Sequence, residues 1–379
     1  MKAVGIIAEY NPFHNGHLFH LEEAKRVSGA DYAVVVMSGN FVQRGEPAVV
    51  NKYARTAMAL HNGADLVLEL PVYYATASAQ YFAAAAIEIL DATGIVEGVC
   101  FGSESGNLEV LQKAADILNE EDVVFQERLR LGLAKGLSFP TARAGALGPL
   151  ASHSPNDILA IEYLRALRRT VRTIKPIAIL RVGAHYHDKI ISGRIASATA
   201  IRKAIHVKDW PAIKQAMPGE AFDILQNTAP VILDDFSGAF HYLIRSRDVE
   251  WAKGILGVNE GIENRIFRTS GEHYLLSEIV RHVKTKRYPF TTIQRTLMHM
   301  LLELKKEDFK NPSYIRVLGF KKESSHLLKQ LETNARLPVV VNLKHAPKIP
   351  MLEKEIQTTD IYHQALPINF EYSVPLTII

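Results

Sequence analysis

The sequence predicts an α/β domain with a parallel sheet over residues 1–205, followed by a mainly helical domain over residues 206–379. Two observations indicate the first domain. Short apolar runs alternate with segments of helical period, and those runs are apolar throughout, as in strands covered on both faces. One observation indicates the second domain: beyond residue 205 most apolar residues recur at helical spacing. The length of 379 residues also fits about two domains.

The elements of the first domain can be assigned in order along the chain. Apolar runs that end in Gly, Pro or polar residues predict strands, and apolar residues three and four apart predict helices. The predicted strands are Ala3–Ala8, Tyr32–Met37, Asp65–Leu70, Gly98–Gly102 and Ile177–Leu180. The predicted helices are Gly16–Val27, Val49–Asn62, Ala77–Leu90 and Asn156–Arg169.

The second domain has a different pattern of apolar residues. Trp210–His282 and Phe290–Leu304 are mostly helical in period, with Gly and Pro residues at the joints. Only Pro338–Asn342 has a strand-like pattern. A mainly α-helical domain over 206–379 is therefore predicted.

Composition and charge narrow the class of protein. The chain is 47% hydrophobic and 22% charged, which are values of an ordinary globular protein. The single cysteine, Cys100, excludes an internal disulfide framework and a Cys-rich zinc site, and is expected to be an inert core thiol. No apolar run reaches the ~20 residues of a membrane-spanning helix, and the first residues lack the pattern of a signal peptide. A cytoplasmic enzyme with no membrane contact is expected.

The basic excess lies in the second half of the chain. Residues 1–200 hold 19 Lys and Arg against 20 Asp and Glu, whereas residues 201–379 hold 25 against 20. This distribution favours a polyanionic partner for the second domain, although a solvated surface would have the same balance.

The loop after the first predicted strand carries two histidines, His14 and His17, around Gly16 at the start of a helix. Free N–H groups at a helix N-terminus favour phosphate, and Gly16 allows close approach of the backbone. An imidazole there can donate to phosphoryl oxygens and stabilise charge in an in-line displacement. The alternatives are a helix cap with a core histidine, or a metal pair, for which no third ligand is evident.

A second polar motif stands near the end of the first domain. In Ile195–Arg202, the hydroxyls of Ser197 and Thr199 can donate to phosphate oxygens, and Arg202 can bind them with two nitrogens. Alone, such a segment is more often a helix cap.

The two motifs together resemble those of a known superfamily. The segment His14–His17, directly after a strand, resembles the HxGH motif of the nucleotidyltransferase superfamily, and Ile195–Arg202 resembles its ISSxxxR-like motif. Ala196 and Ala198 depart from that pattern and leave fewer hydroxyls. The resemblance implies a Rossmann-like nucleotidyltransferase domain that binds ATP over the first loop.

Longer motifs resemble those of a narrower family, the bacterial tRNA(Met) cytidine acetate ligases. They are Ala8–His17, Met37–Pro47, Phe101–Glu104, Ser154–Asp157 and Lys284–Tyr288, and they span both predicted domains. The resemblance implies that ATP activates acetate to acetyl-adenylate with release of pyrophosphate. The acetyl group then passes to N4 of the wobble cytidine (C34) of elongator tRNA(Met), giving N4-acetylcytidine. It further implies Mg²⁺ with ATP and no use of acetyl-CoA. The sequence implies no protein partner.

Site residues follow from the motifs and the resemblance. The expected catalytic residues are His14, His17, Ser197, Thr199 and Arg202. The expected ATP contacts are Ile7, Ala8, Glu9, Tyr10, Asn11, Pro12, Phe13, His14, Asn15, Gly16, His17, Gly102, Asn156 and Arg181. Gly102 could instead serve a tight turn, Asn156 a helix cap, and Arg181 the surface.

Three further groups complete the expected sites. Ser38, Gly39 and Asn40 follow the second strand and are expected to form a small acetate pocket, unless their loop is only structural. Gln43 and Arg44 are expected to add donors to that pocket. Basic residues near one aromatic residue favour RNA, or else form a solvated helix face. They are Lys284, Lys286, Arg287, Arg295, Lys321 and Lys322. No metal site is expected, and the roles of His185 and His187 stay open.

Two other functions are weighed against the ligase. A small-molecule adenylyltransferase would use the same loop, but such enzymes are commonly single α/β domains. A non-catalytic RNA-binding protein could retain the fold, but would have no need of an intact HNGH segment. Oligomeric state, exact tRNA contacts and strictness for acetate are not decided by the sequence.

Overall fold

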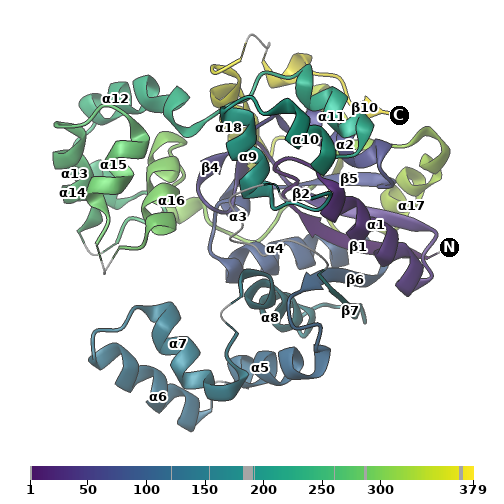
Figure 1. Cartoon of the computed structure of the whole chain (residues 1–379), viewed down its shortest axis with the longest axis horizontal. Coiled ribbons are helices and arrows are strands. Elements are labelled where there is room, and N and C mark those ends of the chain that lie inside the picture. The colour runs from purple at the N-terminus through teal and green to yellow at the C-terminus, as the bar shows by residue number, and fades with distance from the viewer. Residues whose placement is uncertain are drawn as a thin grey trace.

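A computed structural model describes residues 2–120, 122–152, 154–181, 191, 193–259, 261–285, 288–366 and 370–379. An α/β body surrounds a central sheet, and a group of helices, α12–α16, lies to one side of it (Figure 1). Within the described residues, no helix has both the length and the apolar content needed to cross a membrane.

The sheet is mostly parallel. Its strands lie in the order β10-β8-β5-β2-β1-β6-β7, and β9 pairs with β8. The parallel strands are β1 (Ala3–Ala8), β2 (Tyr32–Ser38), β5 (Leu66–Leu70), β6 (Val96–Ser103) and β7 (Lys175–Leu180). β8 (Ile315–Phe320) runs antiparallel to β5, and β9 (Val339–Val340) and β10 (Thr377–Ile378) run parallel to β8. β3 (Phe41–Val42) and β4 (Glu46–Pro47) form a separate two-stranded hairpin.

Helices cover both faces of the sheet, so its central strands are buried throughout. Alternate residues of β1 show this: Val4 and Ile6 belong to one apolar core, and Ala3 to the other. On the first face lie α1 (Asn15–Ser28), α2 (Lys52–His61), α9 (Ala198–His206), α10 (Trp210–Ala216) and α11 (Gly219–Gln226). On the second lie α3 (Val72–Ala75), α4 (Ala79–Ala92), α5 (Leu108–Glu120) and α8 (Pro155–Leu167).

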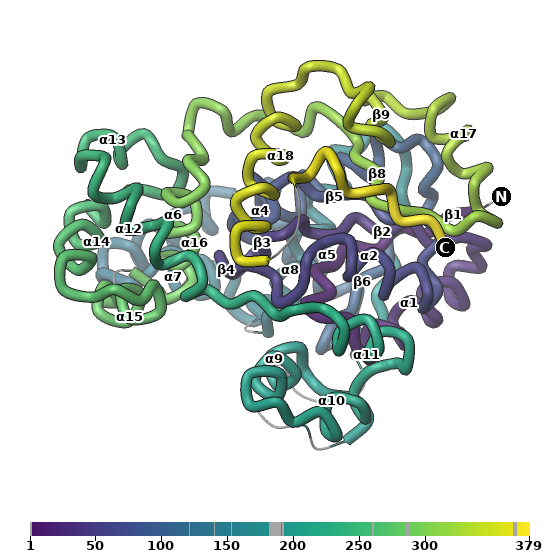
Figure 2. Tube along the Cα trace, turned by 90° about the horizontal axis from the view of Figure 1, so that it is seen from above, coloured from purple at the N-terminus to yellow at the C-terminus, as the bar shows by residue number. Residues whose placement is uncertain are grey.

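The remaining helices extend this body. α6 (Val123–Ala134) and α7 (Phe139–Leu147) form a hairpin beyond α5 (Figure 1). The lateral group consists of α12 (Ser237–Ser246), α13 (Val249–Lys253), α14 (Ile262–Ser270), α15 (Leu276–Val283) and α16 (Phe290–Leu301). After α17 (His326–Asn334) and α18 (Pro350–His363), the C-terminal chain returns along the sheet to β10 (Figure 2).

The α/β class is confirmed, and all five predicted strands and four predicted helices of the first domain are present. The division at residue 205 needs correction, because β8, β9 and β10 bring residues 315–378 back into the same sheet. Residues 206–379 are therefore not one helical domain: the helices α12–α16 are inserted between two parts of the α/β body. α5, α6 and α7 were not predicted.

A buried ion cluster attaches the C-terminal segment to the sheet. Lys52 Nζ on α2 lies 2.8 Å from Glu69 Oε1 on β5 and 2.8 Å from Glu371 Oε1. It also donates to Thr359 Oγ1 on α18 at 3.0 Å. The Lys52 side chain has no exposed surface. One cation thus joins α2, β5, α18 and the turn at Glu371.

We expect Lys52→Met to lower the free energy of unfolding by about 3–5 kcal/mol, because it leaves two buried carboxylates without their counter-charge. Urea denaturation followed by circular dichroism measures this change. The control is Lys113→Met, which removes the solvent-exposed pair with Glu109 and should unfold like the wild type. Equal stability of the two variants would contradict the inference that Lys52 attaches the C-terminal segment to the sheet.

Candidate active site

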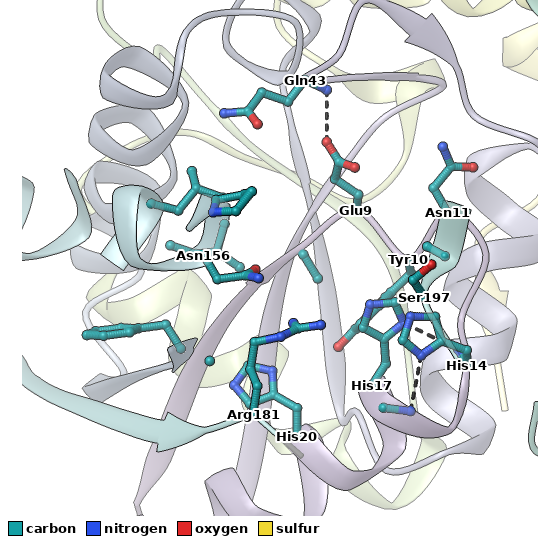
Figure 3. Close-up of a pocket in the computed structure, with 18 of the residues that line it drawn as sticks. Glu9, Tyr10, Asn11, His14, His17, His20, Gln43, Asn156, Arg181 and Ser197 are labelled. Carbon is teal, nitrogen blue, oxygen red and sulfur yellow. Dashed lines mark hydrogen bonds between the residues drawn. The ribbon is translucent and has the colours of Figure 1, made fainter. Parts of the chain in front are cut away.

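One cavity opens at the carboxyl ends of the parallel strands, where ligands of such sheets bind. Its volume is about 400 Å³, in the range of small-molecule sites. The cavity is lined by the loop from β1 to α1, the β3–β4 hairpin, the ends of β6 and β7, and the starts of α8 and α9. Figure 3 shows the side chains of several of these segments directed toward one another.

The two histidines form a stacked pair at the start of α1. Their ring centroids are 3.7 Å apart. His14 Nδ1 accepts the N–H of Gly16 at 3.1 Å, and His17 Nδ1 accepts the N–H of His14 at 3.3 Å. Since each Nδ1 is an acceptor, each neutral ring carries its proton on Nε2. A side chain at Gly16 would crowd the His14 ring, since its Cβ would lie 3.0 Å from Cε1.

Both rings are held neutral. Burial, with the charges of Arg181 and Arg202, lowers the pKa of His14 from 6.5 to about 3. Burial also lowers the pKa of His17 well below its usual value, and His14 and Arg181 add to the effect. The pair therefore presents N–H donors across the physiological pH range without adding charge.

The second motif meets the first in the cavity. Ser197 caps α9 by accepting the N–H of Ala200 at 3.1 Å. Arg202 Nη1 donates to the carbonyl oxygen of Asn11 at 2.8 Å, and its Nη2 lies 3.5 Å from Thr199 Oγ1. Ser197, Thr199 and Arg202 all line the cavity. Two helix N-termini, two imidazoles and a guanidinium thus surround a single space, an arrangement suited to a polyphosphate.

The other wall is formed by β6, β7 and α8. Gly102, Asn156 and Arg181 line it, as expected. Asn156 Nδ2 donates to Glu104 Oε1 at 2.5 Å, and Glu104 Oε2 accepts the N–H of Asp157 at 3.0 Å. Glu104 therefore orients the amide of Asn156 and caps α8.

Most of the predicted loop residues reach the cavity, but three do not. Ile7, Ala8, Glu9, Tyr10, Asn11, His14, Gly16 and His17 line it. Phe13 and Pro12 are buried beneath the loop. Asn15 Nδ2 instead donates to the carbonyl oxygens of Arg194 at 2.8 Å and Gln215 at 3.1 Å, and so joins α1 to the segments around α9.

The expected acetate pocket is not part of the cavity lining. Ser38 and Asn40 are buried, and Asn40 Oδ1 accepts the N–H of Lys52 at 2.7 Å. A Cβ on Gly39 would lie 2.8 Å from Glu69 Oε1 and 2.9 Å from Glu355 Oε1. Two protein carboxyl groups already occupy the space beside Gly39. Farther along the same segment, Gln43, Arg44 and Glu46 do line the cavity.

Sequence reasoning missed the residue that holds these loops in place. Arg55 on α2 is fully buried and donates to the carbonyl oxygens of Glu9, Ser38, Gly39 and Val50. It therefore binds the carboxyl ends of β1 and β2 to α2. The sequence did contain a sign of this role. Arg55 lies on the same helical face as Met58 and Ala59, and a charged side chain on an apolar face must find buried hydrogen-bond partners. His20, which also lines the cavity, was missed as well.

The predicted RNA-binding residues are not one cluster. Lys284 is exposed at the end of α15, whereas Arg295 on α16 is partly buried. Lys321 and Lys322 follow β8, which runs antiparallel to β5, so they lie at the edge of the sheet opposite the cavity. Lys286, Arg287, His185 and His187 lie outside the described residues. Among the residues that are described, no group of three or more His, Cys, Asp or Glu could hold a metal ion.

The doubly covered parallel sheet and the two motifs converging at its carboxyl edge define a nucleotidyltransferase. A family model described as HIGH Nucleotidyl Transferase matches residues 1–373. The tRNA(Met) cytidine acetate ligase of Acetivibrio thermocellus is 43% identical, with 96% of this chain and 94% of that protein covered. The protein of the same name from Caldanaerobacter subterraneus subsp. tengcongensis is 42% identical, with 98% and 97% covered. The chain belongs to the tRNA(Met) cytidine acetate ligase family of HIGH nucleotidyltransferases.

Solved structures agree with this assignment. Thermotoga maritima TmcAL in its apo form matches with a TM-score of 0.94 and 35% identity, over 100% of both chains. The same protein bound with alpha-thio ATP matches with a TM-score of 0.92 and 34% identity, again over 100% of both chains. The predicted family is thus confirmed.

We expect His14→Ala and His17→Ala each to slow ATP–pyrophosphate exchange by about 10²-fold or more, as for loss of one transition-state donor. The Gln variants place an amide N–H near the former Nε2 and should retain more activity. Because the pKa values of both histidines are lowered, that of His14 to about 3, the exchange rate should not change around neutral pH through protonation of either ring. Thermal unfolding of each variant controls for loss of the helix cap. If the Ala variants exchanged at the wild-type rate, the histidines would serve only to cap the helix and would have no catalytic role.

Proposed function

We propose that this protein is an ATP-dependent ligase that forms acetyl-adenylate and transfers the acetyl group to N4 of the wobble cytidine (C34) of elongator tRNA(Met). The observation that carries the proposal is the meeting of the His14–His17 pair with Arg202 in one cavity. The names of the relatives and the alpha-thio ATP bound to TmcAL support it. Because the reaction uses ATP and tRNA, we expect it to take place in the cytoplasm.

The first step would use the neutral donors of the cavity. A carboxylate oxygen of acetate bonds to the α-phosphorus of ATP, and the bond to the bridging oxygen breaks, so pyrophosphate leaves with the electron pair. Charge on the phosphoryl oxygens would be stabilised by the Nε2–H groups of His14 and His17 and by the helix N-termini. Arg202 is suited to the leaving pyrophosphate. Mg²⁺ would enter with ATP, bound to its phosphate oxygens.

Acetate is proposed to bind inside the cavity, beside the β3–β4 hairpin. The sequence already assigned this segment to acetate, and of its predicted donors Gln43 and Arg44 line the cavity. An arginine there offers the charge that an incoming carboxylate needs. The acyl donor is then free acetate activated by ATP, with no part assigned to acetyl-CoA.

The acceptor tRNA is proposed to approach along α15 and α16. The β3–β4 hairpin lies between the cavity and α16, since Gly45 packs against the backbone of Arg295. Lys284 is exposed at the end of the neighbouring helix, and Lys286 and Arg287 follow it in the sequence. Cations on this side of the cavity would hold the phosphates of an anticodon loop.

We expect ATP–pyrophosphate exchange to depend on acetate, and expect added elongator tRNA(Met) to become acetylated without acetyl-CoA. The reason is that the cavity offers donors for both the phosphoryl group and a carboxylate. Radiolabelled acetate incorporated into tRNA, followed by nucleoside mass spectrometry, measures the product. Exchange that requires a phosphorylated metabolite instead of acetate would favour the small-molecule adenylyltransferase. No exchange under any condition would favour a non-catalytic RNA-binding protein.

Charge reversal tests the tRNA side. Lys284→Glu with Lys286→Glu and Arg287→Glu should abolish tRNA acetylation, whereas acetate-dependent exchange should survive, because activation involves no RNA. Each lost phosphate contact should lower the log–log salt slope of tRNA binding by about 0.7–0.9.

The matched comparison is Lys321→Glu with Lys322→Glu at the opposite edge of the sheet, which should acetylate normally. Normal acetylation by the first set, in a folded protein, would refute the proposed RNA surface.

A further inference from the structure

Glu9 is a carboxylate inside a site otherwise built for anions. It follows β1 directly, is half-buried, and lines the cavity. Its Oε1 accepts the backbone N–H of Gln43 at 2.9 Å. In Figure 3 its side chain points toward Gln43 and away from the His14–His17 pair. A carboxylate cannot accept a hydrogen bond from ionised phosphate, so its chemistry must involve another group.

The acetyl-transfer half of the proposed reaction needs a proton acceptor. N4 of cytidine bonds to the acetyl carbonyl carbon, and the bond from that carbon to the phosphate oxygen of the adenylate breaks. AMP leaves with the electron pair, and N4 must lose one proton. A positioned general base contributes about 10²–10⁴-fold to such a step. This requirement rests on the proposed function, since only an amine acceptor brings a proton to be removed.

Few groups in the cavity can take that proton. The Nδ1 atoms of His14 and His17 accept backbone N–H groups, and their Nε2 atoms carry protons. Burial raises the pKa of Tyr10 and Tyr163, so both stay protonated. Arginines cannot accept. His20 lies beside Cys100, and desolvation lowers its pKa to about 4, which makes it a weak base. Among the described lining residues, the carboxylates of Glu9 and Glu46 remain.

The position of Glu9 favours it over Glu46. Glu9 stands between the phosphate-binding imidazoles and the β3–β4 hairpin, whose Gly45 contacts α16. An acceptor arriving along α16 would meet an adenylate on the histidines at this point. Glu46 belongs to the hairpin itself. We propose that Glu9 is the general base that removes the proton from N4 of the acceptor cytidine during acetyl transfer.

The surroundings of Glu9 tune it for this role. Burial raises its pKa, the bond from Gln43 and the charges of Arg202 and Arg44 oppose that rise, and Glu46 reinforces it. Tyr163 and Arg55 also face it. The net effect on the pKa of Glu9 is upward, and a carboxylate with a raised pKa is a stronger base once it is ionised. The transfer rate of the wild type should therefore rise with pH and level off above this raised pKa.

The test compares Glu9→Gln, Glu9→Asp and Glu46→Gln in both half-reactions, using ATP, labelled acetate and elongator tRNA(Met) transcribed in vitro. The amide oxygen introduced by Glu9→Gln retains an acceptor for the N–H of Gln43, so the hairpin should keep its place. We expect Glu9→Gln to slow single-turnover acetyl transfer by about 10²-fold or more beyond any effect that it has on acetate-dependent exchange, because exchange removes no proton from N4. Glu9→Asp should be intermediate, and the pH-dependent limb should vanish in Glu9→Gln.

Three results would overturn the assignment. Normal transfer by Glu9→Gln would remove Glu9 from the step. Equal loss of exchange and transfer would place Glu9 with the nucleotide or its Mg²⁺. Loss of transfer in Glu46→Gln alone would move the role to that residue. If the wild-type protein failed to acetylate tRNA at all, the proposed function would fail and the role of Glu9 with it, whereas normal transfer by Glu9→Gln refutes the role of Glu9 alone.

Discussion

The geometry of the site depends on the hydrogen bonds that the guanidinium of Arg55 donates to backbone carbonyls. This guanidinium is fully buried, and its hydrogen bonds go to four backbone carbonyls. Taking a charge out of water costs several kcal/mol, and neutral carbonyls offset that cost less well than a carboxylate would. The benefit of burying Arg55 here is therefore the geometry that its hydrogen bonds impose on the loops. Through Glu9, Arg55 fixes the loop that carries both histidines, and through Ser38 and Gly39 it fixes the chain that leads to the hairpin.

The cavity offers anions both fixed dipoles and the charges of Arg44, Arg181 and Arg202. The imidazoles of His14 and His17 are neutral donors, and α1 and α9 direct their N-termini to the same space. Arg202 adds a full charge and, by its bond to Asn11, makes the two motifs one structural unit. Dipoles held by backbone hydrogen bonds need no reorganisation when charge develops on a phosphoryl group. The stacked histidines achieve this because each Nδ1 is tied to the helix start.

The parts of the fold and site that depend on residues close together in the sequence could be predicted. The parts that depend on contacts between distant chain segments could not. β1 and the HNGH loop form one continuous stretch, so strand, helix start and histidines could be placed together. β8 pairs with β5, about 250 residues earlier in the chain, and Arg316 interrupts its apolar run. The burial of Ser38, Gly39 and Asn40 away from the cavity has the same cause. Glu69 and Glu355 meet at Gly39 only after α18 has packed on the sheet. Likewise, Lys321 is near Lys284 in sequence, but the reversed direction of β8 carries it to the far edge.

The return of the C-terminal chain to the sheet affects how an acceptor would be presented. Helices α12–α16 enter from α11, which packs on α2, and leave into β8, so both ends of the group are anchored in the α/β body. His299 on α16 reinforces the attachment, since its Nε2 lies 3.0 Å from Thr76 Oγ1 in the α/β body. Its Nδ1, 2.9 Å from the carbonyl oxygen of Leu256, holds the ring within the helical group. Gly45 meets the backbone of Arg295 on the same helix. A group held this way is positioned by packing, unlike a domain on a flexible linker. An RNA bound to it would bring its nucleotide to the cavity at a defined distance, so part of the entropic cost of joining two substrates is met before they react.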